Sequence, residues 1–207
     1  MALKTLSLVK AGDEGTKLHL NLKKGETFSV ELFWESKHDL DAHALLATNN
    51  GDRAKVSGFE QVLSTYVFKR KVGGKIVGEF DRNSDGSFQT LCGSLRHSGD
   101  ALTGKPDNVD EMITIDGSKI GESVNEIPIF VTIHPPGRVK FAEVAKAGIR
   151  IKNDQGVVLA EYQLSKQFGQ SDAVQMGSLV LGANGWEFAE VGVGFNGDFN
   201  TILESFS

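Results

Sequence analysis

The sequence has very little cysteine. Cys92 is the single cysteine among 207 residues, so no disulfide bond can form within the chain. The basic start and apolar segment of a secretory signal are also lacking at the amino terminus. Both absences favour a reducing compartment, and we expect a cytoplasmic protein or a component of a particle assembled inside a cell.

Long apolar runs are missing as well. The longest extends from Ile127 to Ile133, whereas a membrane-spanning helix needs about 20 apolar residues. This run is better explained as a buried strand. We therefore expect no membrane insertion.

Basic residues are not in excess. The formal net charge of −5 argues against general nucleic-acid binding, because contacts to phosphates need a basic face. One local exception surrounds Val72-Gly73-Gly74, where Lys69, Arg70, Lys71 and Lys75 follow closely on one another. A glycine pair between charged residues is typical of a hairpin turn, so we interpret this run as an exposed hairpin tip with solvated charges.

Short segments of alternating or β-branched residues recur along the chain. Turn signals such as Asn50-Gly51, Gly73-Gly74 and Asp116-Gly117 separate them. This pattern predicts an all-β fold, a sandwich or a barrel, in one domain over residues 1–207 with a hairpin insertion around residues 62–95. The expected strands are 3–9, 17–22, 27–34, 42–47, 65–68, 75–80, 113–115, 127–133, 148–152 and 157–163.

Helical periodicity is scarce. Phe199, Ile202, Leu203 and Phe206 recur at helical spacing after Asp198, a suitable N-cap, which predicts a short helix at the end of the sequence. The other candidates are 138–147, which fits a short helix, and 171–179, which fits either a helix or a strand.

Clustered carboxylates are the most informative chemical feature. Asp39 and Asp41 are two residues apart, so in a strand their side chains point to the same side. Like charges this close repel one another or take up protons unless a cation lies between them. Calcium accepts about 6 to 8 oxygen ligands in loose geometry. A glycine-containing loop downstream supplies four more carboxylates. We expect the six carboxylates to form one calcium site: Asp39, Asp41, Asp100, Asp107, Asp110 and Glu111.

Other metal patterns are weaker. Asp81, Asn83, Asp85 and Gly86 match the first half of a helix-loop-helix calcium loop, but Cys92 stands where a bidentate glutamate is expected. We interpret this segment mainly as an acidic turn. Magnesium is less suitable for the main site because it prefers octahedral geometry with several waters, and zinc lacks paired histidine or cysteine ligands.

Catalytic patterns are incomplete. Gly192, Gly194 and Gly197 satisfy G-x-G-x-x-G, but the strand and acidic residue that a dinucleotide fold needs further on do not follow. Cys92 and His97 are near in sequence without a supporting motif. We expect no catalytic residues, no organic cofactor, no small-molecule substrate and no enzymatic activity.

Several segments occur in an order and at a spacing found in one family. They are Phe33-Trp34-Glu35, Asp39-Leu40-Asp41-Ala42, Leu45-Leu46, His97-Ser98-Gly99-Asp100-Ala101-Leu102-Thr103-Gly104, Asp110-Glu111, Val131-Thr132-Ile133-His134, Ala147-Gly148-Ile149-Arg150-Ile151, Leu159-Ala160-Glu161-Tyr162-Gln163-Leu164 and Gly185-Trp186-Glu187-Phe188. With these segments, the chain resembles the TerD family of tellurite-resistance and stress-response proteins, which bind calcium.

The resemblance implies a β-sandwich of two mainly antiparallel sheets with a few short helices, which carries calcium at one rim. It also implies that no enzymatic activity is established for such proteins as a class. The resemblance maps the family's metal ligands onto Asp39, Asp41, Asp100, Asp107, Asp110 and Glu111, with the Leu102 carbonyl as a further ligand.

Two departures from the family pattern matter. Lys105 and Val109 stand where carboxylates are common, so affinity should be lower and one calcium site is expected rather than two. The stretch between Val56 and Arg96 is longer than usual and lacks the family's aromatic-Asn-Asn segment. The extra residues should extend hairpins, on which new partner contacts would be built.

Two functions remain open at this point. The first is a calcium-binding stress protein whose metal orders the rim loops so that they dock a protein partner or a second copy of the chain. The second is a structural component of a larger assembly, such as an oligomer, a scaffold or a viral particle, that uses the same fold.

Overall fold

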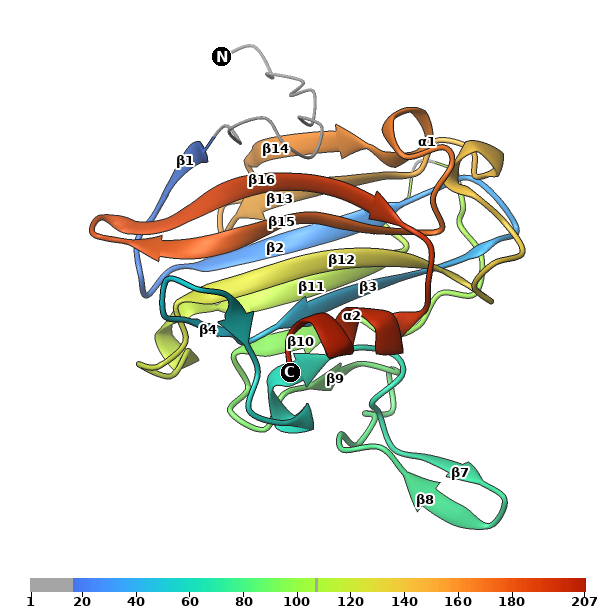
Figure 1. Cartoon of the computed structure of the whole chain (residues 1–207), viewed down its shortest axis with the longest axis horizontal. Coiled ribbons are helices and arrows are strands. Elements are labelled where there is room, and N and C mark those ends of the chain that lie inside the picture. Colours follow the sequence, from blue (N-terminus) through green and yellow to red (C-terminus); the bar gives the residue numbers. More distant parts are fainter. Residues whose placement is uncertain (1–16, 107) are drawn as a thin grey trace.

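The computed structural model describes residues 17–106 and 108–207, whose longer strands form two six-stranded antiparallel sheets (Figure 1). The first sheet has the order β1 (Lys17–Leu22), β16 (Gly185–Phe195), β15 (Ala173–Gly182), β12 (Glu126–His134), β3 (Asp39–Leu45) and β6 (Val62–Leu63). The second has the order β14 (Val158–Gln163), β13 (Gly148–Asn153), β2 (Thr27–Phe33), β11 (Glu111–Asp116), β10 (Leu95–His97) and β9 (Phe88–Gln89).

Smaller elements lie outside these sheets. Two short hairpins pair β4 (Thr48–Asn49) with β5 (Ala54–Lys55) and β7 (Arg70–Val72) with β8 (Lys75–Val77). The helices are η1 (Phe59–Gln61), η2 (Gly117–Lys119), η3 (Phe141–Glu143), α1 (Leu164–Gln167) and α2 (Phe199–Ser205). No helix in the described part of the chain combines the length and the apolar character that crossing a membrane requires.

The two sheets pack face to face, which confirms the predicted β-sandwich. In Figure 1 their strands run in similar directions, one layer in front of the other. Alternation along β11 turns Ile113 and Ile115 inward, where both are fully buried. Across the ladder, Val30 and Phe28 of β2 lie opposite these two residues and are buried as well. Burying side chains of this size contributes about 1.5–3 kcal/mol each, so the core fixes the register.

Most strand predictions are confirmed with boundaries shifted by no more than a few residues. The confirmed segments are 17–22, 27–34, 75–80, 113–115, 127–133, 148–152 and 157–163. The ambiguous segment 171–179 is strand β15, and β3 begins at Asp39 rather than Ala42. The prediction for 65–68 is wrong: Ser64 accepts the backbone N–H of Tyr66 through its Oγ and that of Val67 through its carbonyl, which makes a turn. The expected strand 3–9 lies outside the described residues.

The helix at the end of the sequence is confirmed. The Asp198 carboxylate accepts the backbone N–H of Thr201 and caps α2, whose Phe199 and Ile202 are buried. Figure 1 shows α2 lying over β3. By contrast, the helix expected over 138–147 is reduced to the single turn η3, since Lys140 and Val144 on either side of it are extended and Lys146 takes a positive φ of 52°.

Candidate metal centre

Three carboxylates from distant parts of the sequence meet at one edge of the sandwich. Asp39 and Asp41 lie on the same side of β3, opposite His134 and Thr132 of β12. Asp100 belongs to the loop between β10 and β11. One oxygen from each of the three carboxylates lies within 4.8 Å of the other two. The predicted juxtaposition of the β3 aspartates with the loop is therefore present.

The surroundings of these carboxylates disfavour negative charge. Burial raises the pKa of Asp39 to about 7, and the charges of Asp100 and Glu111 add to the effect. The pKa of Asp41 is raised well above its ordinary value, first by burial and then by Glu111. Without a cation, these groups therefore hold protons that ordinary aspartates have lost at neutral pH.

One oxygen of Asp39 has no partner in the part of the chain that the structure describes. Asp39 Oδ1 is buried and accepts no hydrogen bond from any described residue. A buried acceptor left without a donor costs about 1–3 kcal/mol. A divalent cation between Asp39, Asp41 and Asp100 would remove this cost and the mutual repulsion together. The donor set, which consists of oxygens alone, fits a hard cation.

Asp41 is held in place by two residues that follow β6. Thr65 donates a hydrogen bond from Oγ1 to Asp41 Oδ1 at 2.6 Å, and the Tyr66 hydroxyl lies 3.4 Å from Asp41 Oδ2. The same hydroxyl is 2.6 Å from His134 Nδ1. Burial, followed by the Asp41 and Asp39 charges, raises the pKa of Tyr66 above its ordinary range, so the phenol stays protonated.

The Tyr66 ring also connects this edge to α2. It stacks on Phe199 with the ring centroids 5.6 Å apart and the planes 9° apart. His43, which shares the Asp41 face of β3, packs against Phe199 at 4.8 Å and contacts Thr132 Oγ1 through Nε2 at 2.9 Å. Burial and the nearby His97 lower the pKa of His43 to about 3, so this imidazole is neutral.

Glu111 is fully buried, and its charge acts on both Asp39 and Asp41. Its Oε2 accepts the backbone N–H of Ala42 at 2.8 Å, and its Oε1 accepts that of Ala101 at 3.2 Å. His97 Nε2 lies 3.3 Å from the same Oε2. His97 Nδ1 accepts the N–H of Gly99, and the buried Nε2 makes no hydrogen bond to a described residue although it lies this close to the carboxylate.

Asp110 ties the loop to β2. Its Oδ2 accepts the backbone N–H of Trp34 and its Oδ1 accepts that of Lys105, each at 3.0 Å. Leu102 exposes 65% of its surface on the same loop. Asp107, the remaining predicted ligand, lies outside the described residues.

The loop side of the centre opens to solvent. A cleft beside Asp100 is lined in part by Glu31, Asp85, Asp110 and Arg82. An ion can therefore reach Asp100 without passing through the core. The acidic lining raises the local concentration of cations.

The aspartates of the second acidic motif, residues 81–86, pair with neighbouring side chains. Asp85 Oδ1 accepts the backbone N–H and the hydroxyl of Ser87, and Asp85 Oδ2 pairs with Arg96 at 3.2 Å. Asp81 pairs with Lys69 at 2.9 Å. Among the described residues, these aspartates do not join a three-ligand cluster of the kind formed by Asp39. The interpretation of this segment as an acidic turn agrees with these contacts.

Sequence patterns assigned no role at this centre to Thr65, Tyr66 or His97. Thr65 and Tyr66 fall where a strand was expected, and their contact with Asp41 depends on the turn that ends β6. For His97, the alternation of β10 offered a usable signal, because Leu95 and His97 share its buried face.

Comparisons with known proteins identify relatives along most of the chain. A family model described as the TerD domain matches residues 83–206. The tellurium resistance protein TerD of Alcaligenes sp is 28% identical over 192 residues, which cover 91% of this chain and 97% of that protein. The chemical-damaging agent resistance protein B of Clostridium acetobutylicum is 33% identical over 117 residues, which cover 55% of this chain and 84% of that protein.

A solved structure shares the fold. The crystal structure of a homologue of telluride resistance protein from Streptomyces coelicolor A3(2) superposes with a TM-score of 0.64 over 86% of this chain and 95% of its own. The sequence identity of 19% restricts this likeness to the fold itself.

Proposed function

The chain belongs to the TerD domain family, and from this premise we propose that it is a stress-response protein of the tellurium-resistance type that binds one calcium ion between β3 and the 98–110 loop. The bound ion fixes the loop, and the ordered rim docks a protein partner or a second copy of the chain. The protein acts by binding and carries out no catalysis.

The observation that carries the proposal is the cluster of Asp39, Asp41 and Asp100. Three oxygens within 4.8 Å of one another can contact a single ion, and Asp39 Oδ1 is buried without a donor among the described residues. Folding brings the two carboxylates of β3 close to that of the loop, where they repel one another. A cation that binds them converts this repulsion into a contribution to stability.

The residues divide into ligands and supports. Asp39, Asp41 and Asp100 supply the carboxylate ligands. The Leu102 carbonyl, which the family resemblance adds, and water would complete the shell. Each carboxylate oxygen of Asp110 and Glu111 already accepts a backbone N–H, so these two residues hold the loop in position. Calcium fits this arrangement better than magnesium, because it tolerates irregular geometry and needs few retained waters.

The exposed position of Leu102 supports the docking step. Its side chain leaves 65% of its surface in solvent on the loop that the ion would order. A large aliphatic residue at the tip of a metal-ordered loop offers an apolar contact whose position depends on the ion. Partner binding would then follow metal binding without any change in the sandwich core.

Isothermal titration with calcium and a thermal melt with calcium or a chelator test the proposal. At a calcium concentration 100-fold above Kd, mass action adds about 2.7 kcal/mol to the free energy of unfolding. Asp41→Asn and Asp100→Asn should abolish both the heat of binding and the shift in Tm. Asp154→Asn, at an exposed turn, is the matched control and should keep both. An unchanged Tm for the native chain in saturating calcium contradicts the proposal.

A further inference from the structure

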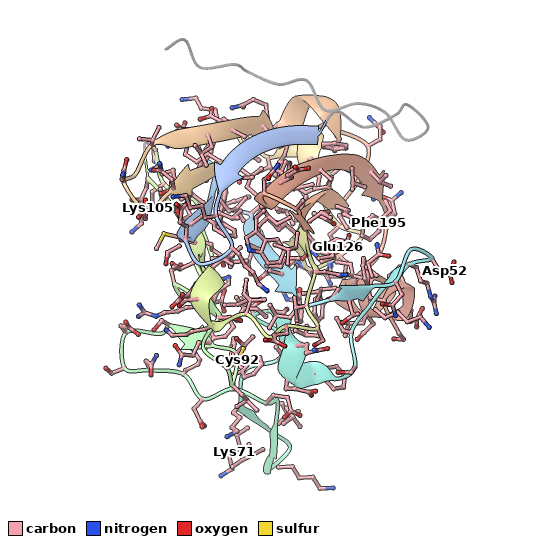
Figure 2. The ribbon with its side chains drawn as sticks, turned by 90° about the vertical axis from the view of Figure 1, so that its left-hand side faces the viewer. Asp52, Lys71, Cys92, Lys105, Glu126 and Phe195 are labelled. Atoms are coloured by element: carbon pink, nitrogen blue, oxygen red, sulfur yellow. The ribbon has the colours of Figure 1, made fainter. Side chains whose placement is uncertain are left out.

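The β7–β8 hairpin stands apart from the sandwich. In Figure 1 it extends away from both sheets, and in Figure 2 Lys71 lies at the far end of the molecule. Its strands pair with each other, Arg70 opposite Val77 and Val72 opposite Lys75, and with no other described strand. The turn is the two-residue Gly73-Gly74, with φ of 56° and 83°. Positive φ at both positions matches the tight turn that suits a twisted ribbon.

The base of the hairpin is anchored firmly. Phe68 and Phe80 flank it in the sequence, and both are buried. The Lys69 backbone N–H donates to the Phe80 carbonyl at 2.6 Å, and the Phe68 ring packs against Phe88 at 5.5 Å. The tip is therefore presented to solvent from a fixed point.

Both faces of the ribbon carry the same mixture of side chains. Lys71 and Ile76 lie opposite each other on one face, and Val72, Lys75 and Val77 share the other, so each face has one lysine beside β-branched residues. Val72, Ile76 and Val77 expose 53%, 74% and 40% of their surfaces. An isolated two-stranded hairpin gains little from such residues in water. Their exposure points to a partner that covers them.

The charge of the hairpin defines the partner. No acidic residue occurs between Lys69 and Gly78, although the whole chain has a net charge of −5. Lys71 and Lys75 have no ion-pair partner within the described part of the chain, whereas Lys69 pairs with Asp81 at the base. Two basic tips repel each other, so a second copy of the hairpin is disfavoured as the occupant. The complementary partner is anionic.

A lipid interface fits the geometry better than a protein groove or a nucleic acid. A groove covers one face of a ribbon and leaves the other in water, and a phosphate backbone leaves aliphatic residues uncovered. The headgroup layer of a bilayer surrounds a tip on all sides. There, aliphatic side chains reach the acyl boundary while lysines extend to lipid phosphates.

We propose that the β7–β8 hairpin docks the protein on the surface of an anionic phospholipid membrane. Val72, Ile76 and Val77 enter the interfacial layer, and Lys71 and Lys75 contact lipid phosphates. The sandwich stays in water, because the chain outside the basic hairpin has a net negative charge and is repelled by the same lipids. This contact is peripheral and independent of the metal centre.

Vesicle sedimentation tests the proposal with the native chain in a chelator, so that the metal centre plays no part. The protein should sediment with vesicles of phosphatidylcholine mixed with phosphatidylglycerol, and stay in solution with vesicles of phosphatidylcholine alone. The double substitution Lys71→Gln with Lys75→Gln should lower the partition coefficient by about 30-fold, from the attraction that each lysine gains near an anionic surface. Val72→Ser with Ile76→Ser should lower it by about tenfold through lost apolar burial.

A control variant and a DNA fragment test whether binding depends on the hairpin and on the lipid. Lys23→Gln with Lys24→Gln removes two exposed lysines from the β1–β2 turn and should leave partition unchanged. Equal loss in this control, or no binding of the native chain to anionic vesicles, overturns the proposal. So does retention of a double-stranded DNA fragment through Lys71 and Lys75 with no vesicle binding, since the partner would then be a nucleic acid. All four residues of the hairpin variants are exposed, so an unchanged Tm verifies that the variants are folded.

Discussion

Glu111 and Ala42 join the two sheets through a single hydrogen bond, in which the Ala42 backbone N–H donates to Glu111 Oε2 at 2.8 Å. Ala42 lies in β3 beyond the end of β6, which pairs only with Ala44 and Leu45. The short β6 therefore leaves an amide of β3 without a strand partner, and the buried carboxylate of the opposite sheet takes that place. Glu111, the acidic residue next to the candidate metal centre, therefore supports the fold as well.

Glu111→Ala should destabilise the protein whether or not calcium is present. The substitution removes the acceptor of the buried Ala42 N–H, at a cost of about 1–3 kcal/mol, and that of the part-buried Ala101 N–H, at a smaller cost. Urea denaturation in a chelator measures the loss of about 2–4 kcal/mol. Glu122→Ala, an exposed glutamate, serves as the control and should change the free energy of unfolding by less than about 0.5 kcal/mol. Stability equal to that of the control would remove the structural role of Glu111.

The sheets of this protein were predictable because their side chains alternate. The pattern Glu111, Ile113, Ile115 repeats every second residue, and so does the inward face of β2. The same alternation already implies that Glu111 faces the interior. The inward position of Glu111 is therefore predictable from the sequence, whereas its assignment as a metal ligand does not by itself require a buried side chain.

The supports of the candidate metal centre were less predictable. The meeting of Asp39, Asp41 and Asp100 was predicted because like charges this close repel one another unless a cation lies between them. Thr65 meets Asp41 only because the chain turns at Ser64 after a two-residue strand. Strand propensity favours extended structure at this segment, and the local Ser64 hydrogen bonds outweigh it.

The metal-free protein should lose stability as the pH rises through about 7. Asp39 binds its proton more tightly in the folded chain, with a pKa of about 7, than at its ordinary value of 3.8. Its protonation therefore contributes stability fully below pH 3.8, and this contribution is lost as the pH rises through about 7. His43 acts in the opposite direction, but its contribution is complete above its ordinary pKa of 6.5. The window from about pH 6.5 to 8 thus isolates the aspartates.

Urea melts across this window, in a chelator, measure the slope. Asp39→Asn should flatten it, because the amide does not titrate, whereas Asp154→Asn should leave it as in the native chain. In the presence of calcium, stability should instead rise with pH. Calcium displaces the protons, so below pH 7 its affinity falls by about tenfold per pH unit for each proton that must be released. A metal-free slope that is flat in the native chain counts against the protonated state of Asp39.

Asp172→Ala should destabilise the entrance to α2. The Asp172 side chain is 1% exposed and accepts the N–H groups of Gly137 and Gly197 and the ammonium group of Lys140. Its removal leaves all three donors without this acceptor, and we expect a loss of about 2–4 kcal/mol in the free energy of unfolding. Calcium titration should be unaffected, since Asp172 is not a ligand. A fall in calcium affinity together with normal stability would contradict this assignment. Asp154→Ala is the exposed control.

Gly104→Ala should loosen the loop that carries Asp100. A Cβ at this position would overlap Cδ1 and the carbonyl oxygen of Trp34. Trp34 is not free to move, because it is 1% exposed and its ring N–H donates to the His38 carbonyl at 2.7 Å. The loop must therefore shift instead, which weakens the hydrogen bond of 2.9 Å from the Gly104 N–H to the Ser36 carbonyl.

The expected cost of Gly104→Ala is about 1–3 kcal/mol of stability, with a fall in calcium affinity because Asp100 moves away from β3. Gly121→Ala is a matched control, since a Cβ there meets no atom within 4 Å. Urea denaturation in a chelator and calcium titration separate the two effects. Since Gly104 is not itself a ligand, reduced affinity in this variant and normal affinity in the control would tie calcium binding to the position of the whole loop. Native stability and native affinity in Gly104→Ala would show that the loop adjusts without cost, and that Asp100 does not depend on the contact with Trp34.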